Sequence, residues 1–153
     1  MKALAKQKKK ETKSPTTVFE MTCCSNPKEI AKIENFVKQI SKKLRFDDGT
    51  MYRLLLACTE AVNNAIIHGN KANPEKKVII RCIVKGQSLN IDVTDEGKGF
   101  NSKILQDPRD EKNLMKEHGR GIFLMRSMMD KVIFKRLKTG YVVGMKMKLH
   151  SHH

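Results

Sequence analysis

Aromatic residues are scarce in this chain of 153 residues, which has no tryptophan, two tyrosines and six phenylalanines. Proteins that bind nucleic acid by stacking bases need more such platforms, so nucleic acid is an unexpected partner. No apolar run approaches the roughly 18 residues of a membrane span. The lysine-rich start also lacks the apolar segment of a secretory signal. The sequence therefore predicts a cytoplasmic protein with no membrane partner.

Acidic residues are few, at 16 against 31 lysines and arginines, and the formal net charge is +15. Such a surplus attracts polyanions, including phosphates and acidic proteins, without choosing among them. Lysines are concentrated within residues 1–13. We predict a basic disordered tail over residues 1–15, one folded domain over 16–149, and a tag remnant over 150–153.

Cysteine is limited to four residues, and none forms a C-x-x-C pair. They are Cys23, Cys24, Cys58 and Cys82. Most of them lie within stretches that are typical of a strand or a helix. We therefore expect reduced structural thiols rather than zinc ligands or disulfides.

Apolar spacing divides the domain into strands and helices. Alternating apolar residues predict strands over 16–24, 77–85, 88–94, 131–137 and 141–149. Helical spacing predicts helices over 30–45 and 50–68, and a shorter helix over 122–130. Residues 101–118 between them are expected to form a long polar loop. We predict an α+β fold, a two-layer sandwich in which helices cover one face of a mainly antiparallel, mixed sheet.

Polar residues interrupt the apolar side of the second predicted helix. Glu60, Asn64 and His68 follow at intervals of four residues and so share one face. A carboxylate and an amide oxygen one turn apart suit Mg²⁺, which takes its remaining ligands from water and phosphate. An exposed helix face would give the same spacing, and these residues alone leave both interpretations open.

A second candidate segment follows the strand predicted over 88–94. Asp95 comes directly after that strand, and Gly97 and Gly99 follow two and four residues later. A carboxylate in this place can accept a hydrogen bond from an exocyclic amine, while the glycines let the backbone approach a flat ring. A simple tight turn also explains the pattern.

A third candidate segment opens the helix predicted over 122–130. Gly119, Arg120 and Gly121 would place free backbone amides and a guanidinium at the positive end of the helix dipole. Such an arrangement favours phosphate. An ordinary capping turn contains the same residues.

Taken in order, the three segments resemble the N, G1 and G2 boxes of the GHKL ATPase/kinase superfamily. They read EAVNNAIIHG over 60–69, DEGKGF over 95–100 and HGRGI over 118–122. Within that superfamily, the chain resembles the bacterial anti-sigma factor/serine-protein kinase family over residues 16–149. The resemblance implies a Bergerat-type ATP-binding fold, with ATP and Mg²⁺ as cofactors. It implies transfer of phosphate to a serine of an anti-sigma factor antagonist, with a sigma factor and a second copy of the chain as further partners to test.

The resemblance also implies a role for each site residue. Asn64 would coordinate Mg²⁺, and Glu60 would act as the general base. Asp95 would bind the adenine amino group, with Gly97 and Gly99 against the base. The other ATP-binding positions are His68, Gly119, Arg120 and Gly121, of which the last three would form a lid over the phosphates.

The chain departs from the family pattern at two places. Relatives often carry a threonine in the last strand that contacts adenine, and our alignment puts Gly144 there, so looser or water-filled adenine recognition is expected. In the lid, Lys116 or Arg120 could contact the γ-phosphate, and the sequence does not choose between them. A nucleotide-dependent binding module without transfer activity is the alternative to a kinase.

Overall fold

The computed structural model describes residues 14–97 and 119–150. Most of the predicted tail, the predicted loop over 101–118, Gly99 and Lys116 therefore lie outside the described residues. The strands are β1 (Thr16–Cys24), β2 (Lys77–Lys85), β3 (Ser88–Asp95), β4 (Lys131–Leu137) and β5 (Gly140–Lys148). The helices are η1 (Pro27–Glu29), α1 (Ile30–Leu44), α2 (Asp48–Asn64) and the π-helical η2 (Ala65–Gly69), and residues 119–128 are also helical.

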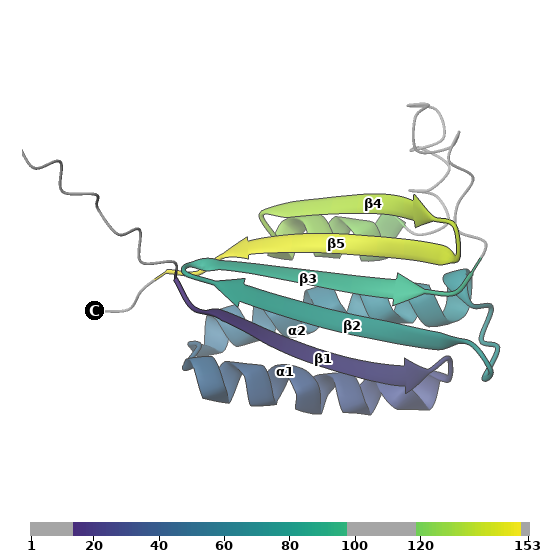
Figure 1. The fold of residues 1–153 in the computed structure, drawn as a ribbon, viewed down its shortest axis with the longest axis horizontal. Coiled ribbons are helices and arrows are strands. Elements are labelled where there is room, and N and C mark those ends of the chain that lie inside the picture. Colours follow the sequence, from purple (N-terminus) through teal and green to yellow (C-terminus); the bar gives the residue numbers. More distant parts are fainter. Residues whose placement is uncertain (1–13, 98–118, 151–153) are drawn as a thin grey trace, which may run out of the picture.

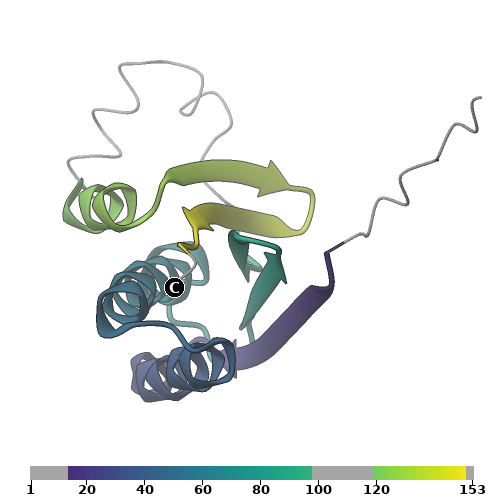
Figure 2. The same ribbon diagram turned by 90° about the vertical axis from the view of Figure 1, so that its left-hand side faces the viewer.

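The strands form one sheet in the order β1-β2-β3-β5-β4, and every neighbouring pair is antiparallel. Figure 1 shows the sheet in front of α1 and α2, and Figure 2 shows the helices together on one side of it. The predicted α+β fold with helices on one face is therefore confirmed. The sheet is wholly antiparallel, although a mixed sheet was expected.

The core lies between the sheet and the helices because each strand buries alternate residues. In β2, for example, the side chains of Val78, Ile80, Cys82 and Val84 are buried. Ile33, Val37 and Ile40 of α1 pack into the same cluster. Full burial of one such aliphatic side chain contributes about 1.5–3 kcal/mol to the free energy of folding. This layer therefore stabilises the sheet, whose strand ends carry the site.

The buried thiols belong to this core. Burial raises the pKa of Cys23 to about 11 and that of Cys82 to about 12, and it also raises the pKa of Cys58. At neutral pH these thiols therefore stay protonated and act as small apolar side chains.

Side-chain caps begin η1, the short helix that leads into α1, and the long helix α2. Asn26 accepts a hydrogen bond from the Lys28 amide at 3.0 Å, ahead of α1. Asp47 accepts one from the Thr50 amide at 2.6 Å, so α2 begins at Asp48, two residues earlier than expected. Such caps satisfy amides that the first turn leaves without partners.

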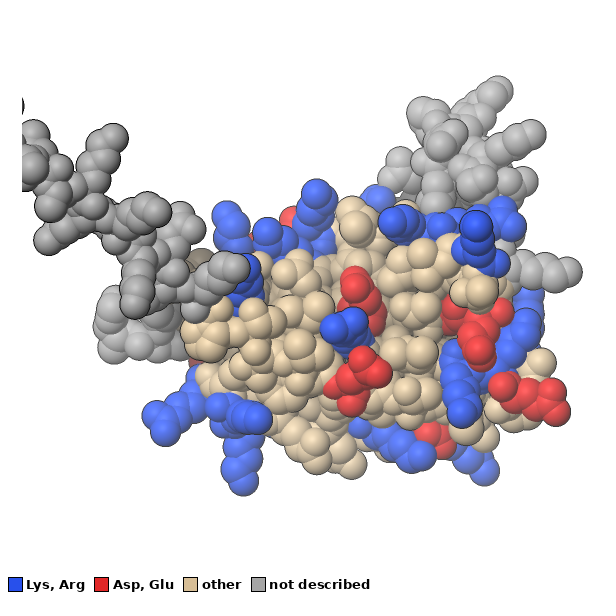
Figure 3. All heavy atoms as spheres, viewed as in Figure 1, with Lys and Arg blue, Asp and Glu red and all other residues tan. Residues whose placement is uncertain are grey.

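The other face of the sheet carries no helix among the described residues. Figure 3 shows uncharged side chains on this face, with basic and acidic groups between them. Val18, Ile79 and Ile133 are large apolar residues exposed here, and Arg81 lies 4.0 Å from Glu20 across β1 and β2. No helix in the described part of the chain is both long and apolar enough to span a membrane.

Candidate functional site

Glu60 and Asn64 lie on the last turn of α2, where the helix changes its winding. After Asn64 the chain continues as the π-helix η2, which the Asn70 amide closes by donating to Ala65 O at 2.8 Å. The prediction of one α-helix over 50–68 is therefore wrong in its last turn. His68 lies on this π-helix, one turn after Asn64. The His68 side chain is exposed.

The helix over residues 119–128 packs against this polar stripe. A Cβ atom placed on Gly121 would lie 2.9 Å from Glu60 Oε2 and 3.4 Å from Asn64 Nδ2. Only a residue without a side chain leaves these two groups undisturbed. Gly119 is half-buried and Arg120 is exposed. The first and third predicted segments therefore meet, although Gly121 comes about 60 residues after Glu60 and Asn64 in the sequence.

Asp95, at the end of β3, is the buried carboxyl group of the site, with 5% of its surface exposed. Its Oδ1 accepts a hydrogen bond from the Gly97 amide at 2.8 Å. Burial raises the pKa of Asp95, and the smaller effects of the Gly97 and Tyr141 amides and of the Lys76 charge oppose this rise. The carboxyl group is therefore held rigidly in a partly desolvated place, as a group that recognises a specific donor should be.

Two glycines allow the backbone to close around Asp95. A Cβ atom on Gly69 would overlap the Asp95 carboxylate, and one on Gly97 would overlap the Gly69 carbonyl oxygen. Gly69 and Gly97 thus approach each other through backbone atoms. Gly97 therefore serves close packing at the predicted position, and Gly69 ends the π-helix against the same carboxyl group.

A narrow pocket with a volume of about 20 Å³ joins these elements at the end of the sheet where β3 stops and β5 starts. Its lining residues are Asn64, Ala65, Gly69, Asp95, Ile122, Phe134, Tyr141 and Val143. Such a volume holds about one water molecule, so side chains must move before a purine base can enter. His68 does not line this pocket, and its role stays a prediction.

The predicted position of Gly144 at the adenine is wrong. A Cβ atom on Gly144 would lie 3.0 Å from Ile133 Cγ1 and 3.2 Å from Asp92 Oδ1, on the face of the sheet without helices. The residues of β5 that line the pocket are Tyr141 and Val143. Successive side chains on a strand point to opposite faces of the sheet. Gly144 therefore faces away from the pocket, whereas Tyr141 and Val143 face it.

Tyr141 is a site residue that the sequence analysis missed. It is 2% exposed, pairs with Asp95 in the register of β3 and β5, and stacks on Phe134 with ring centroids 6.4 Å apart. Burial, and secondly the charge of Asp95, raises the pKa of the Tyr141 hydroxyl. The available signal was its place directly after Gly140, which turns the chain from β4 into β5.

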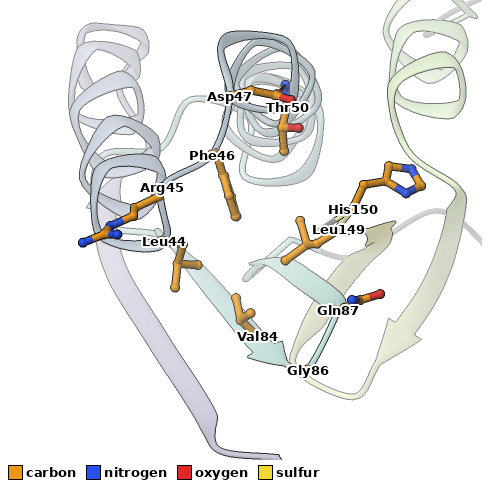
Figure 4. Close-up of a pocket in the computed structure, with 10 residues that line it drawn as sticks. All are labelled: Leu44, Arg45, Phe46, Asp47, Thr50, Val84, Gly86, Gln87, Leu149 and His150. Atoms are coloured by element: carbon orange, nitrogen blue, oxygen red, sulfur yellow. Dashed lines mark hydrogen bonds between the residues drawn. The ribbon is translucent and has the colours of Figure 1, made fainter. Parts of the chain in front are cut away.

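A larger pocket of about 480 Å³ lies at the opposite end of the sheet, beside the β2–β3 hairpin. Figure 4 shows Leu44, Phe46, Val84 and Leu149 around it. None of the predicted site residues lines this pocket. Its size therefore does not make it the candidate site.

Replacing Asp95 with asparagine should change both pH dependence and base selectivity. Because the folded protein raises the pKa of Asp95 above the ordinary 3.8, it holds this proton more tightly than the unfolded chain does. This group's contribution to stability therefore falls as pH rises through the raised pKa. Thermal unfolding between about pH 4 and pH 7 should show this decline in the wild type and lack it in Asp95→Asn.

The same Asp95→Asn variant should lower the ratio of ATP affinity to GTP affinity about tenfold. An unchanged ratio would show that Asp95 does not recognise the adenine.

Replacing Gly97 with alanine should destabilise the fold by about 1–3 kcal/mol, because the new methyl group overlaps the Gly69 carbonyl. Gly49→Ala is the matched control. A Cβ atom there would lie 3.7 Å from Asp47 Oδ1, an ordinary contact in the first turn of α2, so stability should rise by about 0.5–1 kcal/mol. Denaturant unfolding measures both, and equal stabilities would contradict the close approach at Gly97.

Comparisons with known proteins show the family of the chain. The family model "Histidine kinase-like ATPase domain" matches residues 23–147. The Anti-sigma F factor of Anoxybacillus flavithermus is 32% identical over 111 residues, covering 71% of this chain and 73% of the relative. The Serine-protein kinase RsbW of Bacillus licheniformis is 28% identical over 133 residues, covering 83% and 82%.

A solved structure shares the fold. The RsbU and RsbW domains of a Mycobacterium tuberculosis protein superpose with a TM-score of 0.63 at 12% identity, over 88% of this chain and 32% of that longer chain. At this identity the match speaks for the fold alone. The family model that matches most of the chain and the similarity to the two relatives show that this protein belongs to the histidine kinase-like ATPase domain family, in the group of the anti-sigma factors and serine-protein kinases.

Proposed function

We propose that the chain is an ATP-dependent protein serine kinase of the anti-sigma factor type. The observation that carries this proposal is the meeting of Gly121 with Glu60 and Asn64, beside the pocket that Asn64 shares with Asp95. A candidate base, a candidate metal ligand and a candidate adenine-binding carboxylate thus lie around one place. The family to which the chain belongs supports nucleotide binding there.

The donor set fits Mg²⁺ and a triphosphate. The Asn64 side chain offers an amide oxygen next to a helix without a side chain at Gly121, and such oxygen donors suit Mg²⁺. When bound, Mg²⁺ would supply positive charge to the phosphates, with Asn64 as its ligand from the protein. Gly119, Gly121 and the exposed Arg120 would add amide and guanidinium donors to the phosphate oxygens.

Glu60 would act on the substrate serine. Its carboxylate would accept the proton of the serine hydroxyl while the serine oxygen forms its bond to the γ-phosphorus. The bond from that phosphorus to the β-phosphate oxygen breaks, and ADP leaves. Asp95 would hold the adenine ring in place by accepting a hydrogen bond from its amino group. His68 and Gly99 are further proposed contacts of the ATP.

The proposed substrate is an anti-sigma factor antagonist, because relatives are named Anti-sigma F factor and Serine-protein kinase RsbW. A sigma factor is the proposed second partner, and a homodimer in the cytoplasm is the proposed state. Nothing in the function requires the chain to contact a membrane or nucleic acid.

Transfer of the γ-phosphate tests the proposal. We expect label from γ-labelled Mg-ATP to reach an antagonist protein, and to fail to reach a variant in which the acceptor serine is alanine. Specific ATP binding without any labelled antagonist would instead support the alternative, a nucleotide-dependent binding module. A labelled product on the alanine variant would contradict transfer to that serine.

A further inference from the structure

Asn70, directly after η2, is a buried asparagine outside the three motif segments. It has no exposed surface. Its side-chain amide donates to Ser25 Oγ at 2.7 Å and to Lys77 O at 3.0 Å. Its side-chain oxygen accepts from the Glu96 amide at 2.8 Å. Both donor hydrogens and the acceptor of this amide are thus used, as a buried polar group requires.

These bonds tie together three strand ends. Ser25 follows β1, Lys77 begins β2, and Glu96 follows β3. Two further bonds close the network: Ser25 Oγ donates to Lys76 O at 2.6 Å, and the Lys77 amide donates to Glu96 Oε2 at 2.6 Å. Glu96, the first residue after β3, is therefore held through both its backbone amide and its side chain.

We infer that Asn70 is a positioning residue for base recognition by Asp95, an inference that rests on the proposed function. By accepting from the Glu96 amide, Asn70 fixes the peptide plane between Asp95 and Glu96. That plane directs the next amide, of Gly97, back to Asp95 Oδ1 at 2.8 Å. The Tyr141 amide also contacts the Asp95 carboxylate, so Asn70 controls one of the two backbone amides that orient this group in the pocket.

Asn70 acts here without lining the pocket. Its removal releases the Glu96 amide, and the Gly97 amide can then turn away from the carboxylate. Asp95 then keeps its charge and the Tyr141 amide but loses the Gly97 amide, so its carboxylate is held less firmly. The expected loss is therefore in selectivity for adenine rather than in attraction of the phosphates.

Hydrogen exchange tests the positioning step without any nucleotide. In the wild type the Glu96 amide should exchange as slowly as amides within β3, because its acceptor is buried. In Asn70→Ala the Glu96 and Gly97 amides should exchange faster than those of β3. A Glu96 amide that exchanges in the wild type like an exposed turn would overturn the inference, even if Asn70→Ala proved too unstable to study.

Nucleotide selectivity tests the functional step, with Ser25→Ala as the matched control. Both variants lose hydrogen bonds of the same buried network, so both should be less stable than the wild type. Only Asn70→Ala frees the Glu96 amide, and we expect it to lower the ratio of Mg-ATP to Mg-GTP affinity about tenfold while Mg-pyrophosphate binding is kept. An unchanged ratio in Asn70→Ala, or an equal fall in Ser25→Ala, would overturn the inference.

The proposed function and the inference fail in different ways. A wild type that binds Mg-ATP and Mg-GTP equally contradicts adenine recognition itself. In that case the inference falls as a statement about base selectivity, and the exchange rates of the Glu96 and Gly97 amides still decide whether Asn70 holds the turn after Asp95.

Discussion

Phosphate transfer should fall by about 10²–10⁴-fold when Glu60 is replaced by glutamine, because a general base typically contributes that much. Glutamine has nearly the same shape as glutamate but cannot accept the serine proton. Its neighbour Asn64 and the close contact with Gly121 remain, so Mg-ATP binding should be kept. Single-turnover transfer to the antagonist, measured beside equilibrium binding of ATP, separates the two effects.

Glu34→Gln provides the matched control for this experiment. Glu34 lies exposed on α1, where it pairs with Lys38 at 2.9 Å, so the same change of charge occurs far from the site. We expect its transfer rate to equal that of the wild type. If Glu60→Gln transferred phosphate as fast as Glu34→Gln, Glu60 would not be the base, and a structural role for it would remain.

Asn64→Ala should lower Mg-dependent ATP affinity by about 100-fold or more, since even residues behind the ligands of a metal typically contribute 10–100-fold. The variant removes the proposed Mg²⁺ ligand from the last turn of α2. Isothermal titration with ATP, with and without Mg²⁺, measures the effect. The loss should appear only in the presence of Mg²⁺.

Asn63→Ala is the control for Asn64→Ala, because it removes the same amide from the neighbouring position. A step of one residue turns the side chain by about 100° around the helix, so Asn63 does not share the face of Glu60 and Asn64. Asn63 is half-buried and does not line the pocket at Asp95. Equal losses in the two variants would contradict a metal-ligand role for Asn64.

The strands could be predicted from the sequence almost residue by residue, and the reason is physical. One face of the sheet packs on helices, so residues such as Val78, Ile80 and Cys82 must be apolar while their neighbours face solvent. That alternation, together with Gly86 at a turn with φ +58°, defines β2 and β3. The cap at Asp47 likewise depends on local chemistry that the sequence displays.

The π-helix η2, which follows α2, could not be predicted from periodicity. The spacing of Glu60, Asn64 and His68 fits an α-helix, whereas the close approach of Gly69 to Asp95 and the bonds of Asn70 favour a π turn. Those contacts come from residues far along the chain. Asn70 itself was missed because an asparagine after a glycine is also typical of an ordinary helix end.

The site was predictable only in part. Gly121 lies against Glu60 and Asn64, as the family resemblance leads one to expect. No local sequence pattern could have predicted this contact, because the segments lie far apart in the chain. Tyr141 and Gly144 show the limit of that resemblance, because the choice between them depends on which face of β5 each residue occupies. The pairing of Asp95 with Tyr141 answers that question, and it requires the sheet register.

Ligand-induced shifts of the unfolding temperature test the proposed adenine-selective Mg-ATP site at the end of β3. At about 100 times its dissociation constant a ligand stabilises by about 2.7 kcal/mol, which should raise the midpoint by about 5–10 °C for a chain of this size. Because the chain carries a net charge of +15, Mg-pyrophosphate and Mg-GTP are needed as controls for general attraction of anions. We expect a large shift with Mg-ATP and small shifts with both controls. Equal shifts with all three ligands, or none with Mg-ATP, would contradict an adenine-selective site.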